Sequence, residues 1–183
     1  MIHPEDTAQD GTTFRSNGSR HRGVNKATLE KRESVLESAI EADLQGEPVP
    51  QPQPKWMPAT VDGRDELYQR MIIAKQELKG RLAENAKKPK SRRRDESKIV
   101  VSLTDPVAAF ARDKQKTFCF LYTTQFMVDS DSLMVLYFSV SPENSDAGTL
   151  APMIDRVQNL IGGTLKRVSV DAGYTSLLDL QDC

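Results

Sequence analysis

Residues 117–140 have the sequence TFCFLYTTQFMVDSDSLMVLYFSV, an apolar stretch with one polar interruption. Residues 117–128 and 133–140 are rich in β-branched and aromatic side chains, which favour strands. Between them, the tetrapeptide DSDS is polar and turn-forming. The stretch therefore predicts an antiparallel β-hairpin, with Asp129 and Asp131 as turn residues.

The segments on both sides of this hairpin alternate between strand and helix patterns. Residues 98–103 (KIVVSL) and 165–170 (LKRVSV) predict short strands. After the hairpin, apolar residues recur at helical spacing from Leu150 to Ile161, and Gly162 ends the pattern. This order of elements predicts an α/β fold for residues 95–183.

Residues 25–94 have a different pattern, which predicts two helices joined by a connector. The first helix is expected between an N-cap at Asn25 and Gly46, and the second from about Asp62 to Ala86. Five prolines between residues 48 and 58 exclude helix there and favour an extended segment. Because each helix has one narrow apolar face, we expect an antiparallel helical hairpin, packed on itself or on a partner.

Two basic segments lie on either side of the helical hairpin. Residues 87–94 (KKPKSRRR) carry six positive charges in eight positions, and such a run stays in solvent. Residues 1–24 are polar without an apolar period, and they predict a mobile tail with a second basic string. The side chains expected to contact phosphates, should nucleic acid bind, are Arg15, Arg20, Arg22, Lys87, Lys88, Lys90, Arg92, Arg93 and Arg94.

The overall composition restricts the class of protein. The 25 Lys and Arg residues nearly balance the 26 Asp and Glu residues, so no net field attracts the chain to nucleic acid or membrane. No apolar stretch approaches the length of a membrane span, and the first residues do not resemble a secretory leader. The two cysteines have no metal-binding spacing. These features predict a cytoplasmic protein without membrane contact.

Two carboxylates stand where an α/β sheet can form a site. Asp171 follows a predicted strand and precedes Ala172 and Gly173, and ligands bind at the carboxyl ends of strands in such sheets. Asp10 likewise precedes a glycine. Brought together, the two side chains could hold a hard divalent cation. The alternative for Asp171 is an N-cap, and for Asp105 and Asp146 a cap or turn.

Five short segments occur in an order that resembles a known family. They are residues 9–22 (QDGTTFRSNGSRHR), 103–106 (LTDP), 122–129 (YTTQFMVD), 150–153 (LAPM) and 170–174 (VDAGY). Together they resemble the DDE transposases of bacterial insertion sequences. In that family a DGT motif supplies the first catalytic aspartate and a DAGY-type motif the second. The matching positions are Asp10 and Asp171.

The resemblance implies a function in DNA transposition and recombination. It implies a partial RNase H-like mixed sheet with an inserted helical hairpin, whose acidic residues hold Mg²⁺ for phosphodiester cleavage and strand transfer. Its partners would be the DNA of transposon ends and other copies of the chain. The family's third acidic residue is a glutamate well downstream of the DAGY motif, whereas this sequence stops twelve residues after Asp171. We therefore expect a truncated chain that is inactive by itself.

Two other functions remain open at this point. The chain could be a non-catalytic DNA-binding or regulatory fragment, or its helical hairpin could be a protein-interaction module. The expected layout is the same for all three: a basic segment with the DGT motif over residues 1–24, a helical hairpin with a basic linker over 25–94, and part of a catalytic domain over 95–183.

Overall fold

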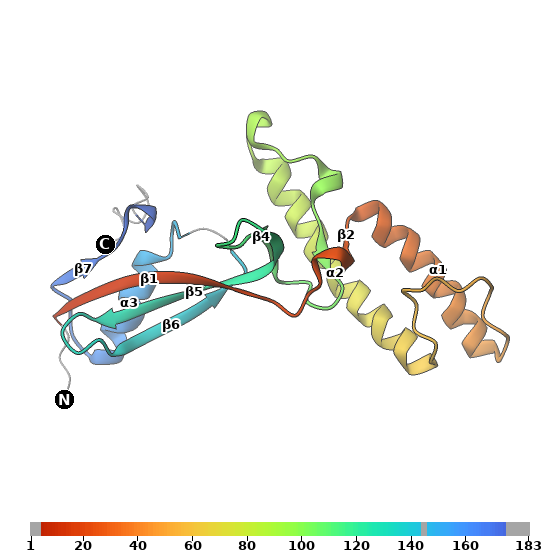
Figure 1. The fold of residues 1–183 in the computed structure, drawn as a ribbon, viewed down its shortest axis with the longest axis horizontal. Coiled ribbons are helices and arrows are strands. Elements are labelled where there is room, and N and C mark those ends of the chain that lie inside the picture. The colour runs from red at the N-terminus through yellow and green to blue at the C-terminus, as the bar shows by residue number, and fades with distance from the viewer. Residues whose placement is uncertain (1–4, 144–145, 175–183) are drawn as a thin grey trace. The chain divides into compact units, whose positions relative to one another are not determined.

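The computed structural model describes residues 5–143 and 146–174, which form a mixed α/β structure of two compact units (Figure 1). The first unit holds Met1–Arg15, Asp113–Lys116 and Leu121–Cys183, and the second holds Ser16–Arg112 and Thr117–Phe120. The strands are β1 (Asp6–Arg15), β2 (Gly23–Val24), β3 (Val101–Ser102), β4 (Ala109–Arg112), β5 (Phe118–Asp129), β6 (Val135–Ser141) and β7 (Arg167–Ser169). The helices are α1 (Lys26–Gln45), α2 (Val61–Lys87) and α3 (Leu150–Ile161), with 3-10 turns η1 (Arg20–Arg22), η2 (Lys90–Arg92), η3 (Glu96–Lys98) and η4 (Ala172–Tyr174).

A mixed sheet organises the first unit. Its strand β1 pairs antiparallel with β5 and parallel with β7, while β5 also pairs antiparallel with β6 (Figure 1). The β5–β6 hairpin is the one that its sequence predicts, and Asp129 accepts hydrogen bonds from Ser132 in the turn. Helix α3 and strand β7 also lie where the sequence pattern predicts them, although β7 is shorter than expected. Strand β4, which pairs with β5, was not expected from the sequence.

Strand β1 shows that the expectation of a mobile tail at residues 1–24 is wrong. Its sequence has little β-forming apolar content, which is why the local pattern gave no strand. Residues 7–15 pair with β5 and residues 6–8 also pair with β7, which provides partners for these backbone groups, and Thr7 and Gln9 are buried. Long-range pairing therefore outweighs the weak local propensity.

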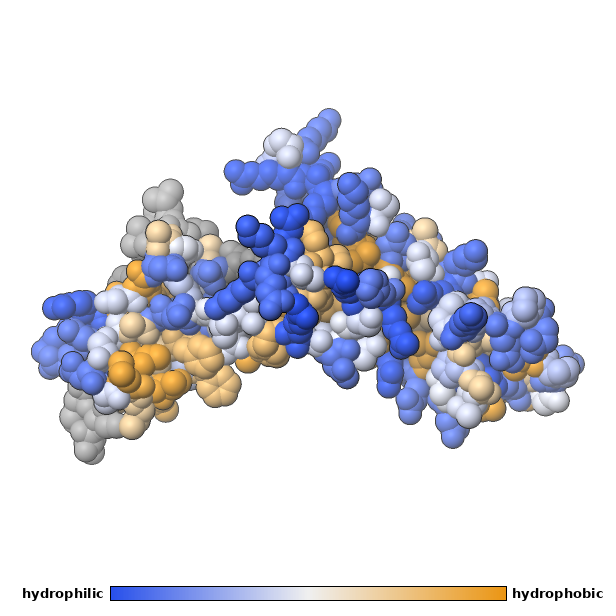
Figure 2. Space-filling model, in the orientation of Figure 1, coloured by the Kyte–Doolittle hydropathy of each residue, from blue (hydrophilic) through white to orange (hydrophobic). Residues whose placement is uncertain are grey.

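Helix α3 covers one face of this sheet. Met127 of β5 packs there against Met153 and Val157 of α3. The opposite face keeps large apolar side chains in solvent: Phe14 is 46% exposed, and Phe138 on β6 is 60% exposed. Figure 2 shows the resulting hydrophobic patch over β6.

The second unit is built on the predicted helical hairpin. The Asn25 side chain caps α1 by accepting a hydrogen bond from the Thr28 N–H, and Gly46 ends the helix in the left-handed conformation with φ 69°. Thr60 caps α2 in the same way. Although α2 has 27 residues, neither it nor any other helix in the described ranges is apolar enough to cross a membrane.

The apolar stripes of the two helices are buried within this unit. Leu29 and Leu36 of α1 pack with Met71 and Leu78 of α2, and Val101 of β3 completes the core. The stripe of α2 is therefore covered by the chain itself.

Two arginines fix the position of α2. Near its start, Arg64 forms a buried two-pronged ion pair with Asp43 at the end of α1, with N–O distances of 2.6 and 2.5 Å. Further along, Arg81 donates to the backbone carbonyls of Val100, Pro106, Val107 and Ala108. The first contact sets the two helices antiparallel, and the second holds the loop that contains the LTDP segment.

Candidate active site

The parallel pairing of β1 with β7 lies just before the two predicted aspartates in both segments. Thr7 pairs with Val168 and Ala8 with Ser169. Asp10 and Asp171 each lie two residues beyond this last pair. Both side chains are exposed, and Asp171 follows the carboxyl end of its strand. This is the end of a parallel pair at which α/β proteins bind ligands.

Each aspartate has a backbone partner close to it in sequence. Asp10 accepts a hydrogen bond from the Gly11 N–H at 2.7 Å, and Asp171 accepts one from the Gly173 N–H at 2.9 Å. Asp171 therefore also caps the turn η4, as the local alternative predicted. A carboxylate oxygen has two lone pairs, so these bonds leave both groups able to accept further ligands.

A buried chain of hydrogen bonds lies next to the two aspartates. The Tyr174 side chain is 2% exposed and donates its hydroxyl proton to Gln125 Oε1 at 2.5 Å. Gln125 in turn donates from Nε2 to Asp146 Oδ1 at 2.7 Å. The chain joins the turn after β7, the middle of β5 and the segment before α3.

Two glycines leave room for these hydrogen-bonded side chains. A Cβ at Gly11 would lie 2.8 Å from the Tyr174 hydroxyl and 2.8 Å from Gln125 Oε1, closer than side chains tolerate. A Cβ at Gly173 would lie 3.1 Å from Asp171 Oδ1 and 3.6 Å from Asp146 Oδ2. Gly11 therefore leaves space for the Tyr174 hydroxyl. Gly173 allows its backbone to lie close to the carboxylates of Asp171 and Asp146.

The pKa of Tyr174 reflects its burial and the negative charges near it. Burial, followed by the charges of Asp146, Asp10 and Asp171, raises the pKa of Tyr174 to about 12. Each of these effects disfavours the phenolate. Three carboxylates thus act on one hydroxyl group, which remains protonated near neutral pH.

The sequence alone gives Gln125 no role, predicts a cap or turn at Asp146 and includes Tyr174 only as part of the VDAGY segment. Asp146 does lie in the predicted turn, because its carbonyl accepts from the Thr149 hydroxyl at 2.6 Å, but its side chain points to Gln125. A glutamine in the middle of an apolar strand is the one signal that could have indicated a buried polar network. Nothing in the local sequence links it to Asp146 or Tyr174.

The donors available to a metal ion are few. Within residues 5–143 and 146–174, no group of three or more His, Cys, Asp or Glu side chains could hold an ion. Asp10 and Asp171 each follow the β1–β7 pairing by two residues, and the charges of both act on Tyr174. Their oxygens suit Mg²⁺, which proteins often bind through one or two carboxylates, waters and substrate phosphates.

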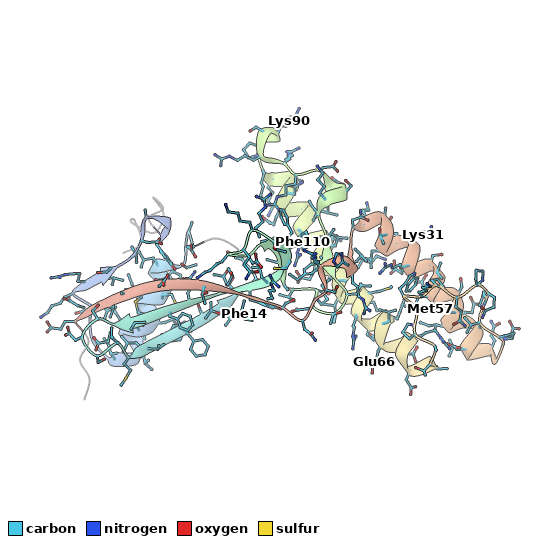
Figure 3. The ribbon with its side chains drawn as sticks, in the orientation of Figure 1. Phe14, Lys31, Met57, Glu66, Lys90 and Phe110 are labelled. Atoms are coloured by element: carbon cyan, nitrogen blue, oxygen red, sulfur yellow. The ribbon has the colours of Figure 1, made fainter. Side chains whose placement is uncertain are left out.

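The predicted phosphate contacts are all exposed, and several already have partners. Arg15 of the first unit forms an ion pair with Asp113 at 2.5 Å. The other eight lie in the second unit. There, Lys87 pairs with Glu84 at 2.6 Å, and Arg93 donates to the Lys88 carbonyl at 2.7 Å. Figure 3 shows Lys90 extended at the tip of the loop after α2.

The comparisons with known proteins add no relative. No protein-family model matches the chain, and no curated protein or solved structure matches it significantly.

Proposed function

We propose that the chain is a DDE transposase-family protein whose first unit is a partial RNase H-like catalytic domain. The observation that supports this proposal is the parallel pairing of β1 with β7, since its last pair, Ala8 with Ser169, lies two residues before both Asp10 of the DGT motif and Asp171 of the DAGY motif. A coincidental resemblance gives no reason for two motifs so far apart in sequence to lie beside the same parallel strand pair. The mixed sheet with α3 on one face is compatible with the proposed fold.

The contact between the two motifs gives further support. Tyr174, the last residue of DAGY, lies where only the glycine of DGT leaves space for it. Through Gln125, the same hydroxyl is linked to Asp146. We infer that Tyr174 and Gln125 are positioning residues, which hold the turn of Asp171 against the strand of Asp10.

In this proposal, Asp10 and Asp171 hold Mg²⁺. When bound, the ion would polarise a phosphoryl oxygen of DNA and favour ionisation of the attacking water or hydroxyl group. The chain's own contribution is to place two anionic oxygen donors on neighbouring strands, with the backbone N–H groups of Gly11 and Gly173 orienting them. The protonated Tyr174 hydroxyl adds no charge to the site.

The basic residues of the second unit supply the proposed DNA contact. The exposed side chains of η1 and of residues 87–94 can neutralise phosphates. Binding through such contacts depends on salt: for each tenfold rise in salt concentration, the logarithm of the affinity falls by about 0.9 per contact. Such contacts bring affinity without sequence specificity. Because the described residues contain no third metal-binding carboxylate, we expect the chain alone to bind DNA without cleaving it.

A DNA-binding and cleavage assay tests this proposal. The purified chain, Asp10→Ala and Asp171→Ala are incubated with supercoiled and linear DNA, with Mg²⁺ or Mn²⁺, at several salt concentrations. Asp155→Ala, an exposed aspartate on α3, is the matched control. We expect salt-sensitive binding by all four proteins and no cleavage. Cleavage lost only in the two site variants would overturn the expected inactivity but support the site, whereas no DNA binding at low salt would contradict the proposal.

A further inference from the structure

A second candidate site lies in the helical unit. It is an open pocket of about 500 Å³ between the α1–α2 connector, the start of α2, η1 and the loop after β3. Figure 3 labels two of its neighbours, Met57 on the connector and Glu66 on α2. The volume is in the range of pockets that bind small organic ligands.

The lining of this pocket combines an aromatic surface with positive charge. Its apolar part consists of Trp56, Pro58, Leu67 and Leu103, and its cationic side chains are Arg22, Arg32, Lys55 and Arg70. A single carboxylate, Glu66, also lines the pocket. This carboxylate accepts from Arg70 at 3.3 Å, and both side chains are largely exposed.

Three of these four cations have no counter-ion among the described residues. In the part of the chain that the structure describes, no carboxylate lies within ion-pair distance of Arg22, Arg32 or Lys55. The Arg32 guanidinium instead lies over the Trp56 ring, 5.3 Å from its centroid. Arginine guanidinium groups and aromatic rings both stack with nucleobases in nucleic-acid-binding proteins, and we call this pair of planar groups the Trp56–Arg32 platform.

We propose that this pocket binds a nucleotide, with the base against the Trp56–Arg32 platform and the phosphate near Arg22 and Lys55. The ligand must combine two properties: an aromatic ring that can displace water from the apolar lining, and an anionic group that neutralises the unpaired cations. Inorganic phosphate has only the second property and an uncharged aromatic only the first. The nucleotide can be free or part of a single strand, while in duplex DNA the base is stacked and paired away from such a platform.

The single tryptophan of the chain makes this proposal directly testable. Because Trp56 is the only indole, its fluorescence reports this pocket alone. The full chain is titrated with thymidine monophosphate, a short single-stranded oligothymidylate, a short duplex and inorganic phosphate. We expect saturable quenching by the mononucleotide, the single strand or both. Comparing the two ligands shows whether the pocket binds a free nucleotide or a nucleotide within a single strand. Phosphate should compete without quenching.

Charge variants separate the pocket from general electrostatic attraction. Lys55→Gln should weaken nucleotide binding about tenfold, the usual loss for one charged hydrogen bond. Arg32→Gln should also weaken it, because the planar guanidinium that stacks with the base is lost. Lys31→Gln removes the same charge from an exposed neighbour of Arg32 that does not line the pocket, and it should leave binding unchanged. Trp56→Phe keeps an apolar ring in the connector and should retain binding, measured with a labelled oligonucleotide, better than Trp56→Ala.

Two results would overturn the inference. One is the absence of saturable quenching by both the mononucleotide and the single strand, and the other is an equal loss of binding in Lys31→Gln and Lys55→Gln. Asp10→Ala and Asp171→Ala should not affect this quenching. The proposal of nucleotide binding can therefore be wrong while the proposed transposase function is right, and the reverse is also possible.

Discussion

Gly11 lies against the hydroxyl group of Tyr174, so closely that a Cβ at residue 11 would be 2.8 Å from the Tyr174 oxygen. The two residues are far apart in sequence, yet each is part of a short motif that contains an aspartate. Their contact locks the turn that carries Asp171 against the strand that carries Asp10. It gives a physical reason for the glycine that follows the first aspartate.

Gly11→Ala should destabilise the first unit by about 1–3 kcal/mol, the usual cost of overpacking a filled site. The added methyl group must displace Tyr174 or Gln125 and stretch their hydrogen bond. Urea denaturation followed by far-ultraviolet circular dichroism measures the change. Gly163→Ala is the control in the same unit, since its Cβ would have only a 4.0 Å contact with Ile161. Equal stabilities of the two variants would contradict the described packing.

The stability of the first unit should fall as the pH rises from about 10 to about 12, because the pKa of Tyr174 is raised to about 12. In this window the folded chain keeps a proton that the unfolded chain has lost, so deprotonation favours unfolding. The stabilising effect is complete below pH 10 and is lost as the pH passes the raised value. Tyr174→Phe should show a flatter dependence over this window in urea titrations. An unchanged dependence would show that another group is responsible.

The sequence predicts most of the architecture, because local patterns decide most of it. The helical hairpin, the β5–β6 hairpin and α3 follow from periodicity and from clear caps such as Asn25 and Gly46. Strand β1 does not, because it is stabilised by two neighbouring strands rather than by its own composition. For the same reason, the sequence identifies Asp10 and Asp171 through their motifs but gives no role to Gln125 and predicts only a cap or turn at Asp146. The contact between these two side chains exists only in the folded chain.

Asp43→Asn should destabilise the helical unit by about 3–5 kcal/mol, since it leaves the buried Arg64 guanidinium without its counter-ion. Glu66→Gln breaks an exposed pair with Arg70 on the same helix and should cost less than about 1 kcal/mol. Trp56 fluorescence during urea denaturation monitors this unit. Similar losses in the two variants would show that the Arg64–Asp43 pair is not buried in solution.

The exposed sheet face should cause self-association. Val135, Phe138 and Val140 of β6 are 51%, 60% and 50% exposed, and a contiguous apolar surface of this kind favours contact with another molecule (Figure 2). Sedimentation velocity should show a concentration-dependent increase in mass, which Phe138→Lys reduces. Leu44→Lys, at an 84% exposed position on α1, is the control. A monomer at all concentrations would contradict this prediction.

The proposal that Asp10 and Asp171 form one cation site is tested most directly by a Mn²⁺ titration, with electron paramagnetic resonance as the measurement of binding. We expect the wild-type chain to bind Mn²⁺, Mg²⁺ to compete for it, and both Asp10→Asn and Asp171→Asn to abolish this binding while Asp155→Asn retains it. Binding that survives in either site variant, or no binding by the wild-type chain, would contradict a shared cation site at Asp10 and Asp171.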